Sequence, residues 1–269
     1  MSDNGTPTKL DRKQFLTRAG AAGAGVVASS AALGAFAPAI AAAKKGGISK
    51  SDLEILGAAQ VAEALAVTTY TNIINTSPFF TRLPDDDQGY LQAARQEEMS
   101  HYLLEESVTK KPSPFTTFYY PAKMFADAQT TLNTLVTLED AFIAAYLVGV
   151  RDFSNANLRV TAARIMGIES DHRTLARVLA ADVSAADGGP IESITGLAGV
   201  AEPVEPPNNN GYERTQRWTS IKSALTALTP FASATAAAKA GFDASKGYKF
   251  EPFTPKLAAA QGEFHSFLG

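Results

Sequence analysis

The stretch RQEEMSHYLLEE, residues 95–106, contains the most informative pattern of this chain. Within it, Glu98 and His101 stand three residues apart, which on an α-helix makes them neighbours on one face, so both side chains can reach one point beside the helix. Glu169 and His172 repeat the spacing, and the whole sequence has only three histidines. One such pair is common on a solvated helix. Two copies on two long helical segments predict a shared metal site.

Four segments around these pairs have apolar residues at helical spacing: 51–77, 85–110, 127–153 and 155–183. Ser51 and Glu54 form a capping-box pattern that predicts the start of the first helix, and Ser77-Pro78 ends it. The second helix follows Pro84 and ends near Lys110. The segment 112–121 lacks a helical period and is expected to be an extended connection anchored by aromatic residues.

Glu63 and Glu139 interrupt the apolar stripes of the first and third helices, so both are expected to point inward, where a carboxylate needs a partner. At about 1.5 Å per residue, Glu63 and Glu98 lie at the same level of an antiparallel helix pair, and so do Glu139 and Glu169. The link between the second and third helices, extended, spans about 50 Å and can return along the bundle. The sequence therefore predicts six convergent side chains: Glu63, Glu98, His101, Glu139, Glu169 and His172.

This layout resembles the ferritin-like di-iron or di-manganese carboxylate proteins over residues 50–185, in particular their exported, desiccation-related type. The resemblance implies an all-α four-helix bundle with a long crossover between helices 2 and 3. It also implies two iron or manganese ions, with Glu63 and Glu139 as terminal ligands, Glu98 and Glu169 as bridging ligands, and one histidine for each ion. An oxygen-rich site with two imidazoles suits either metal. The alternative is a bundle whose buried glutamates and histidines pair only with one another.

Five other residues have weaker signals. Tyr70 and Tyr146 lie two turns beyond Glu63 and Glu139. Core packing is the simpler interpretation, and phenols beside the metal ions are the alternative. Glu105 is expected to be solvated; an extra ligand or a carboxylate in an entry channel is the alternative. His265 is expected at the surface, and Trp218 is expected to anchor a fifth helix.

Three parts of the chain are expected: an export signal (1–43), the helical bundle (44–185) and a C-terminal extension (186–269). Arg12, Lys13 and Phe15 resemble a twin-arginine signal, and an Ala- and Gly-rich run leads to a cleavage site near Ala41–Ala43. A retained membrane anchor is the alternative. The extension contains an amphipathic helix with apolar residues from 218 to 228, ending at Pro230, and a tail (250–255) that we expect to lie extended against the bundle.

Composition and net charge exclude several classes of function. The chain has no cysteine, which excludes disulfides, thiolate metal ligands and a cysteine nucleophile, and its net charge of −3 gives no basic surface for nucleic acid. We expect an exported protein whose two metal ions react with oxygen or peroxide, as a ferroxidase, peroxidase or catalase-like enzyme in oxidative or desiccation stress. The alternative is a protein without enzymatic activity that sequesters metal or serves as an envelope stress or scaffold protein. The expected partners are the metal ions, the small oxidant and, for the precursor, the export machinery; the sequence leaves a homo-oligomer open.

Overall fold

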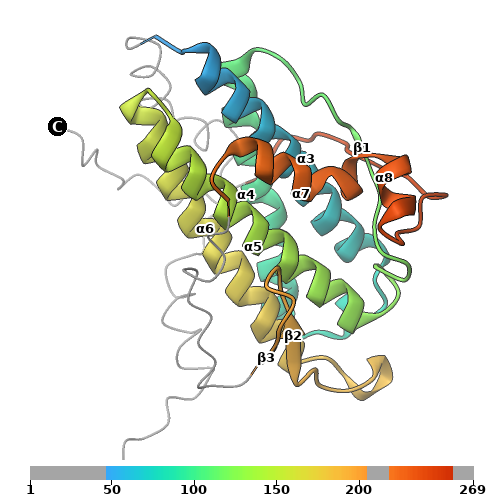
Figure 1. Cartoon of the computed structure of the whole chain (residues 1–269). Coiled ribbons are helices and arrows are strands. Elements are labelled where there is room, and N and C mark those ends of the chain that lie inside the picture. The colour runs from blue at the N-terminus through green and yellow to red at the C-terminus, as the bar shows by residue number, and fades with distance from the viewer. Residues whose placement is uncertain (1–46, 205–217, 257–269) are drawn as a thin grey trace, which may run out of the picture.

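The computed structural model describes residues 47–204 and 218–256. Four long helices form two pairs (Figure 1): α3 (Lys50–Thr76) packs against α4 (Asp85–Thr109), and α5 (Ala128–Asp152) packs against α6 (Ala156–Ala181). The predicted all-α, ferritin-like four-helix bundle is confirmed, and each helix agrees with its predicted range to within two residues. The expected export signal and His265 lie outside the described residues.

The start of α3 corrects the predicted cap. The N-cap is Ser49 rather than Ser51: the Ser49 hydroxyl accepts a hydrogen bond from the amide of Asp52 at 3.0 Å, and the Asp52 carboxylate accepts one from the amide of Ser49 at 3.3 Å. Both serines satisfy the local pattern. Asp52 also accepts hydrogen bonds from the amide and hydroxyl of Ser154, in the turn between α5 and α6, at 2.7 and 2.6 Å. This contact between distant segments selects Ser49.

The link from α4 to α5 runs along the bundle as an extended segment, as predicted (Figure 1). Within it, β1 (Thr117–Phe118) pairs antiparallel with β4 (Tyr248–Lys249) near the end of the described chain. The side chains of Phe118 and Tyr120 are buried in the main apolar cluster, so aromatic residues anchor this connection. A long crossover of this kind lets α5 begin at the end of the bundle where α3 ends.

The C-terminal part packs α7 (Ile221–Ala232) across α3 and α5, followed by the short α8 (Ala234–Lys239). Two details of the prediction are wrong. Trp218 precedes the N-cap Ser220 and is not part of the helix, and α7 continues through Pro230 instead of ending there. Proline removes one backbone hydrogen bond. Continuing the helix buries Phe231 against the bundle, which offsets that loss.

A hairpin, two short 3₁₀ turns and the tail after β4 also lie on the bundle. The hairpin of β2 (Ser193–Thr195) and β3 (Ala201–Pro203) packs on α5, and short 3₁₀ turns lie at Phe80–Arg82 and Ala185–Asp187. The tail after β4 lies extended against α4, as predicted: the rings of Phe250 and Tyr102 are 4.7 Å apart, and the guanidinium of Arg95 lies 4.4 Å from the ring centre of Phe253.

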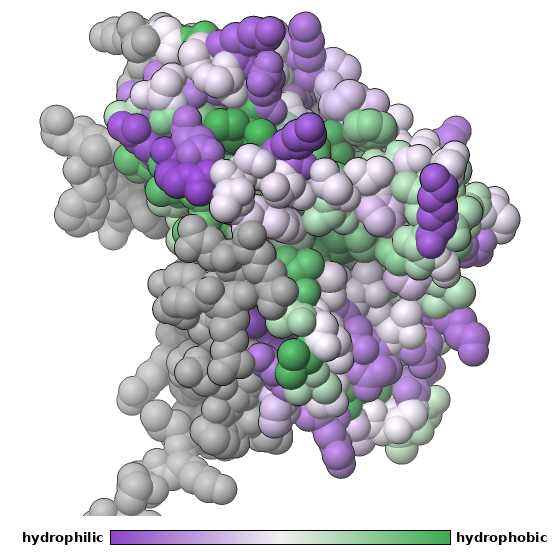
Figure 2. All heavy atoms as spheres, in the orientation of Figure 1, coloured by the Kyte–Doolittle hydropathy of each residue, from purple (hydrophilic) through white to green (hydrophobic). Residues whose placement is uncertain are grey.

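The apolar core has two parts, with polar side chains between them. Along α6, Ile165 belongs to the smaller cluster and Ala176 to the larger one, and Glu169 and His172 lie between. On the face shown in Figure 2, hydrophobic residues appear in small groups among hydrophilic ones. Among the described helices, α5 alone has the length and hydropathy of a membrane span, and most of it is buried in the bundle. The core therefore encloses a polar layer contributed by all four helices.

Candidate metal centre

All six predicted site residues lie in this polar layer. Glu63 comes from α3, Glu98 and His101 from α4, Glu139 from α5, and Glu169 and His172 from α6. None of the six side chains is more than 4% exposed. The sequence places them inward because each occupies a position of its helix's apolar stripe. The structure places these six residues at one level along the bundle, as the helix lengths predicted.

The six residues form two overlapping groups. Glu63 and His101 belong to the first, Glu139 and His172 to the second, and Glu98 and Glu169 to both, with the candidate ligand atoms of each group within 4.8 Å of one another. Such groups are compatible with a metal-binding site.

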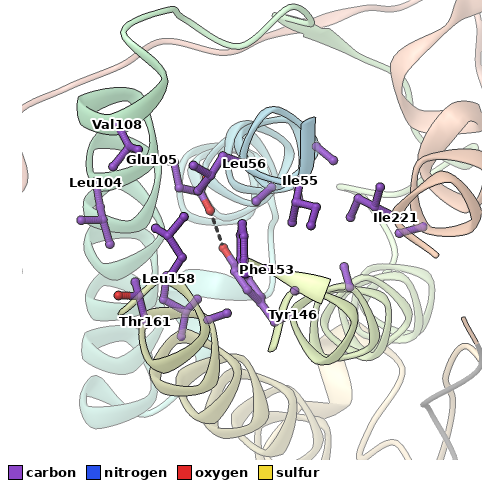
Figure 3. Close-up of a pocket in the computed structure, with 18 of the residues that line it drawn as sticks. Ile55, Leu56, Leu104, Glu105, Val108, Tyr146, Phe153, Leu158, Thr161 and Ile221 are labelled. Atoms are coloured by element: carbon purple, nitrogen blue, oxygen red, sulfur yellow. Dashed lines mark hydrogen bonds between the residues drawn. The ribbon is translucent and has the colours of Figure 1, made fainter. Parts of the chain in front are cut away.

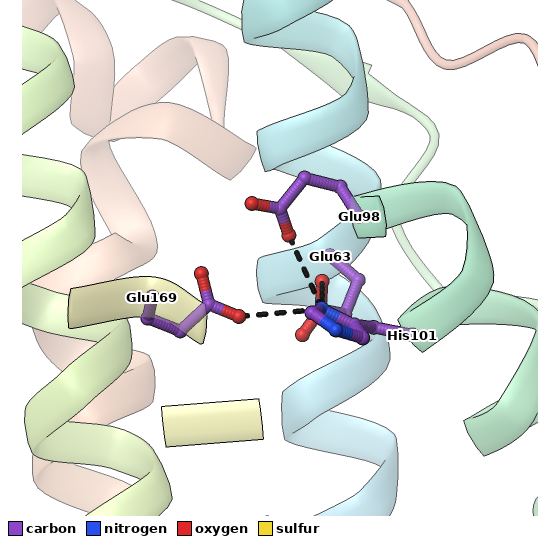
Figure 4. A group of neighbouring side chains, drawn as sticks. All are labelled: Glu63, Glu98, His101 and Glu169. Atoms are coloured by element: carbon purple, nitrogen blue, oxygen red, sulfur yellow. Dashed lines mark ion pairs between the residues drawn. The ribbon is translucent and has the colours of Figure 1, made fainter. Parts of the chain in front are cut away.

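The two shared carboxylates are each oriented toward both imidazoles. Oε2 of Glu98 lies 3.6 Å from Nδ1 of His101, and its Oε1 lies 2.7 Å from Nδ1 of His172. Glu169 does the same, with Oε1 3.3 Å from Nδ1 of His101 and Oε2 3.5 Å from Nδ1 of His172. Figure 4 shows the first group, with Glu63 Oε2 3.5 Å from Nδ1 of His101. Each shared carboxylate thus gives one oxygen to each group.

These buried polar atoms are under-satisfied by the protein. Among the described residues, the oxygens of Glu98 and Glu169 and Nδ1 of both histidines form ion pairs with one another, but none of these atoms makes a hydrogen bond of good geometry. Burying so many polar atoms without well-formed hydrogen bonds is costly, and natural proteins rarely do it without a ligand. Four carboxylates also match the charge of two divalent cations. The donor atoms therefore fit metal ions better than they fit one another.

Burial and mutual repulsion shift the pKa values of the cluster. Burial, with the charge of Glu98, raises the pKa of Glu63 and Glu139 well above the usual range. Burial also opposes ionisation of Glu98, but His172 and His101 outweigh it and hold the pKa of Glu98 below its usual value. The neighbouring carboxylates likewise outweigh burial at both histidines and raise their pKa. The layer thus attracts positive charge.

Tyr70 and Tyr146 form hydrogen bonds with Glu139 and Glu63. The simpler interpretation of these tyrosines, core packing, was therefore incomplete. The hydroxyl of Tyr70 donates to Oε1 of Glu139 at 2.6 Å. The hydroxyl of Tyr146 contacts Oε1 of Glu63 and, at 2.9 Å, Oε1 of Glu105. Because a hydroxyl carries one proton, Tyr146 donates to one carboxyl group and accepts from the other. Burial raises the pKa of Glu105 well above its usual range.

Of two further glutamates close to the site, Glu105 was expected in the wrong environment and Glu97 was missed. Glu105 was expected to be solvated but is 2% exposed, because the inward face of α4 continues one turn beyond His101. Glu97 is partly exposed, and its Oε2 lies 2.8 Å from Nε2 of His172. This contact fixes the imidazole so that Nδ1 faces the shared carboxylates. Spacing gave no signal for Glu97, since its partner lies on another helix.

Comparison with known proteins matches one family, described as a ferritin-like domain, over residues 51–182. The matched segment begins in the first turn of α3 and ends directly after α6, so it contains the whole bundle and all six site residues. Neither curated proteins nor solved structures give a match.

Proposed function

Residues 51–182 form a ferritin-like domain, and on this premise we propose that the chain binds two iron or manganese ions and reacts with oxygen or peroxide. Glu63 and His101 would hold one ion, and Glu139 and His172 the other. Glu98 and Glu169 would serve both. The observation that supports this assignment best is that each shared carboxylate gives one oxygen to each imidazole group.

A pair of iron or manganese ions supplies a two-electron redox couple, which suits a ferroxidase, peroxidase or catalase-like reaction in oxidative or desiccation stress. The chain's own residues create the conditions for it. The apolar clusters on both sides of the polar layer exclude bulk water, and Tyr70 and Tyr146 hold Glu139 and Glu63 in place by hydrogen bonds. The phenol of Tyr146 also connects Glu63 with Glu105, so a proton can be held at either carboxyl group.

Elemental analysis of the reconstituted mature protein tests the metal assignment. We expect close to two iron or manganese ions per chain, and a loss of at least one with Glu98→Ala; the exposed Asp171→Ala, on α6, is the control. Finding no stoichiometric metal, or a single zinc ion, would contradict the proposal.

Consumption of hydrogen peroxide or oxygen by the loaded protein tests the reaction separately. Activity that follows metal content across these variants supports an oxidoreductase. Two tightly held ions without any consumption of either oxidant would instead indicate the alternative, a protein that sequesters metal or serves the cell envelope as a stress or scaffold protein.

We also propose export of the folded chain through a twin-arginine-like signal in residues 1–43, with cleavage near Ala41–Ala43. Replacing the pair by Arg12→Gln with Lys13→Gln should leave the precursor in the cytoplasm. The control, Lys9→Gln with Arg18→Gln, removes the same charge and keeps the pair. Normal processing of the first double variant would argue against this route.

A further inference from the structure

A pocket lies beside the candidate metal centre, between the four bundle helices and the start of α7 (Figure 3). It contains about 750 Å³ of empty space, a volume that includes the solvent at its mouth. Pockets that bind small molecules commonly have an apolar lining with a few polar groups. The lining here is almost wholly apolar, with large side chains from every wall, among them Ile55, Leu104, Phe153, Leu158, Ile165 and Ile221.

The polar groups of this pocket are Glu105, Tyr146 and Thr161. The Thr161 hydroxyl is satisfied, since it donates to the carbonyl of Asn157 at 2.9 Å. Glu105 and Tyr146 point toward each other from α4 and α5 (Figure 3), joined through Oε1 of Glu105. The other oxygen, Oε2 of Glu105, is buried and has no hydrogen-bond partner among the described residues.

The unpartnered Oε2 of Glu105 indicates that the pocket, among its described residues, lacks a hydrogen-bond donor for this oxygen. A buried carboxyl oxygen without a donor destabilises the protein, and a donor on a bound molecule would remove this cost. Glu105 belongs to neither of the two candidate metal-binding groups, so a metal ion held by those groups leaves its Oε2 free. The surrounding walls offer only hydrocarbon contacts. They would exclude a charged molecule and favour an apolar one.

We infer that this pocket binds a small uncharged molecule with a hydrocarbon body and one hydroxyl group, and that the hydroxyl donates to Oε2 of Glu105. The body would lie between the walls formed by α3 and α5, and the hydroxyl beside Tyr146, whose own hydroxyl contacts Glu63 of the candidate metal centre. The site stands whether or not the metal assignment does, because none of its lining residues belongs to the six proposed ligands.

Calorimetric titration of the purified chain with 4-propylphenol and with propylbenzene tests the inference, since the two probes differ by the hydroxyl alone. We expect both to bind, the phenol about tenfold tighter, as befits one additional hydrogen bond in an apolar site. Glu105→Leu should remove this preference and leave the binding of propylbenzene intact. A phenol preference that persists in Glu105→Leu would overturn the role of Glu105.

Two filling variants test the location. Ala145→Phe and Ala59→Phe place a ring into the pocket from α5 and α3, and each should weaken both probes at least tenfold; Leu147→Phe, on α5 outside the lining, is the matched control. Melting temperature and metal content, compared with wild type, identify any variant that misfolds, and the second filling variant then decides. The inference would be overturned if the folded filling variants bound both probes as tightly as the wild-type chain does. It would also be overturned if the wild-type chain bound neither probe. Probe binding without stoichiometric metal would contradict only the proposed function.

Discussion

The hydroxyl of Tyr70, on α3, donates a 2.6 Å hydrogen bond to the carboxylate of Glu139, on α5. Tyr146 makes the reciprocal contact, from α5 to Glu63 on α3. Each tyrosine lies two turns beyond the glutamate of its own helix and holds the glutamate of the other. The two helices that contribute one carboxylate each are therefore related by an approximate twofold exchange. The Glu and His pairs on α4 and α6 exchange in the same way, since Glu98 faces His172 and Glu169 faces His101.

Loss of the Tyr70 hydroxyl should weaken metal binding. Tyr70→Phe leaves Oε1 of Glu139 buried without its donor, so the carboxylate is no longer held toward the centre. We expect metal affinity to fall about tenfold or more, as for other groups that orient ligands. Titration with Fe²⁺ or Mn²⁺ measures this. Tyr102→Phe, whose hydroxyl accepts from the amide of Ser113, is the control and should bind as wild type does. Equal affinities for all three proteins would contradict the prediction.

Metal should stabilise the wild-type bundle and stabilise Glu98→Ala much less. Ions that bind the folded site and not the unfolded chain raise the free energy of unfolding by about 2.7 kcal/mol at a hundredfold excess over the dissociation constant. Without metal, Glu98→Ala should be less stable than wild type, since His172 and His101 then lose the buried carboxylate that they face. Thermal melting with and without metal, beside Asp171→Ala, measures both effects. An equal metal-dependent rise in wild type and Glu98→Ala would show that Glu98 is not a ligand.

Glu97 should affect metal affinity although it is not a predicted ligand. Glu97→Ala removes the partner of Nε2 of His172 and should lower affinity about 10- to 100-fold. Glu97→Gln keeps an acceptor oxygen and should lower it less. The exposed Glu54→Gln controls for the loss of surface charge. If Glu97→Ala binds metal as tightly as wild type, the contact does not orient the imidazole.

Asp52 should make stability depend on pH in acid. Burial would raise its pKa, but the hydrogen bonds from Ser154 and Ser49 outweigh burial and lower it. The ionised carboxylate of Asp52 therefore stabilises the folded state in full when the pH is above its unfolded-state pKa of about 3.9. This contribution is lost as the pH falls through the lower folded-state pKa. Asp52→Asn should therefore cost about 1–2 kcal/mol at pH 7 and progressively less below pH 4. Urea unfolding across this pH range measures the difference, with exposed Asp171→Asn as control. A constant difference would argue against the charge of Asp52.

Helix periodicity was enough to predict the bundle and the six convergent side chains. The reason is that both signals are local: a helix turns through a fixed angle per residue, so spacing alone states which side chains share a face. A glutamate such as Glu63 or Glu139 within an apolar stripe, and a glutamate three residues before a histidine, can be recognised without knowing what packs opposite. Helix lengths then placed these positions at one level.

The remaining features depend on contacts between segments that are distant in the sequence. Ser49 caps α3 in place of Ser51 because Ser154, far along the chain, binds Asp52. Glu97 reaches the centre only because α6 presents His172 beside it. α7 passes through Pro230 because the bundle offers Phe231 a place to pack. In each case the deciding free energy comes from a contact between segments remote in sequence, which periodicity within one helix does not encode.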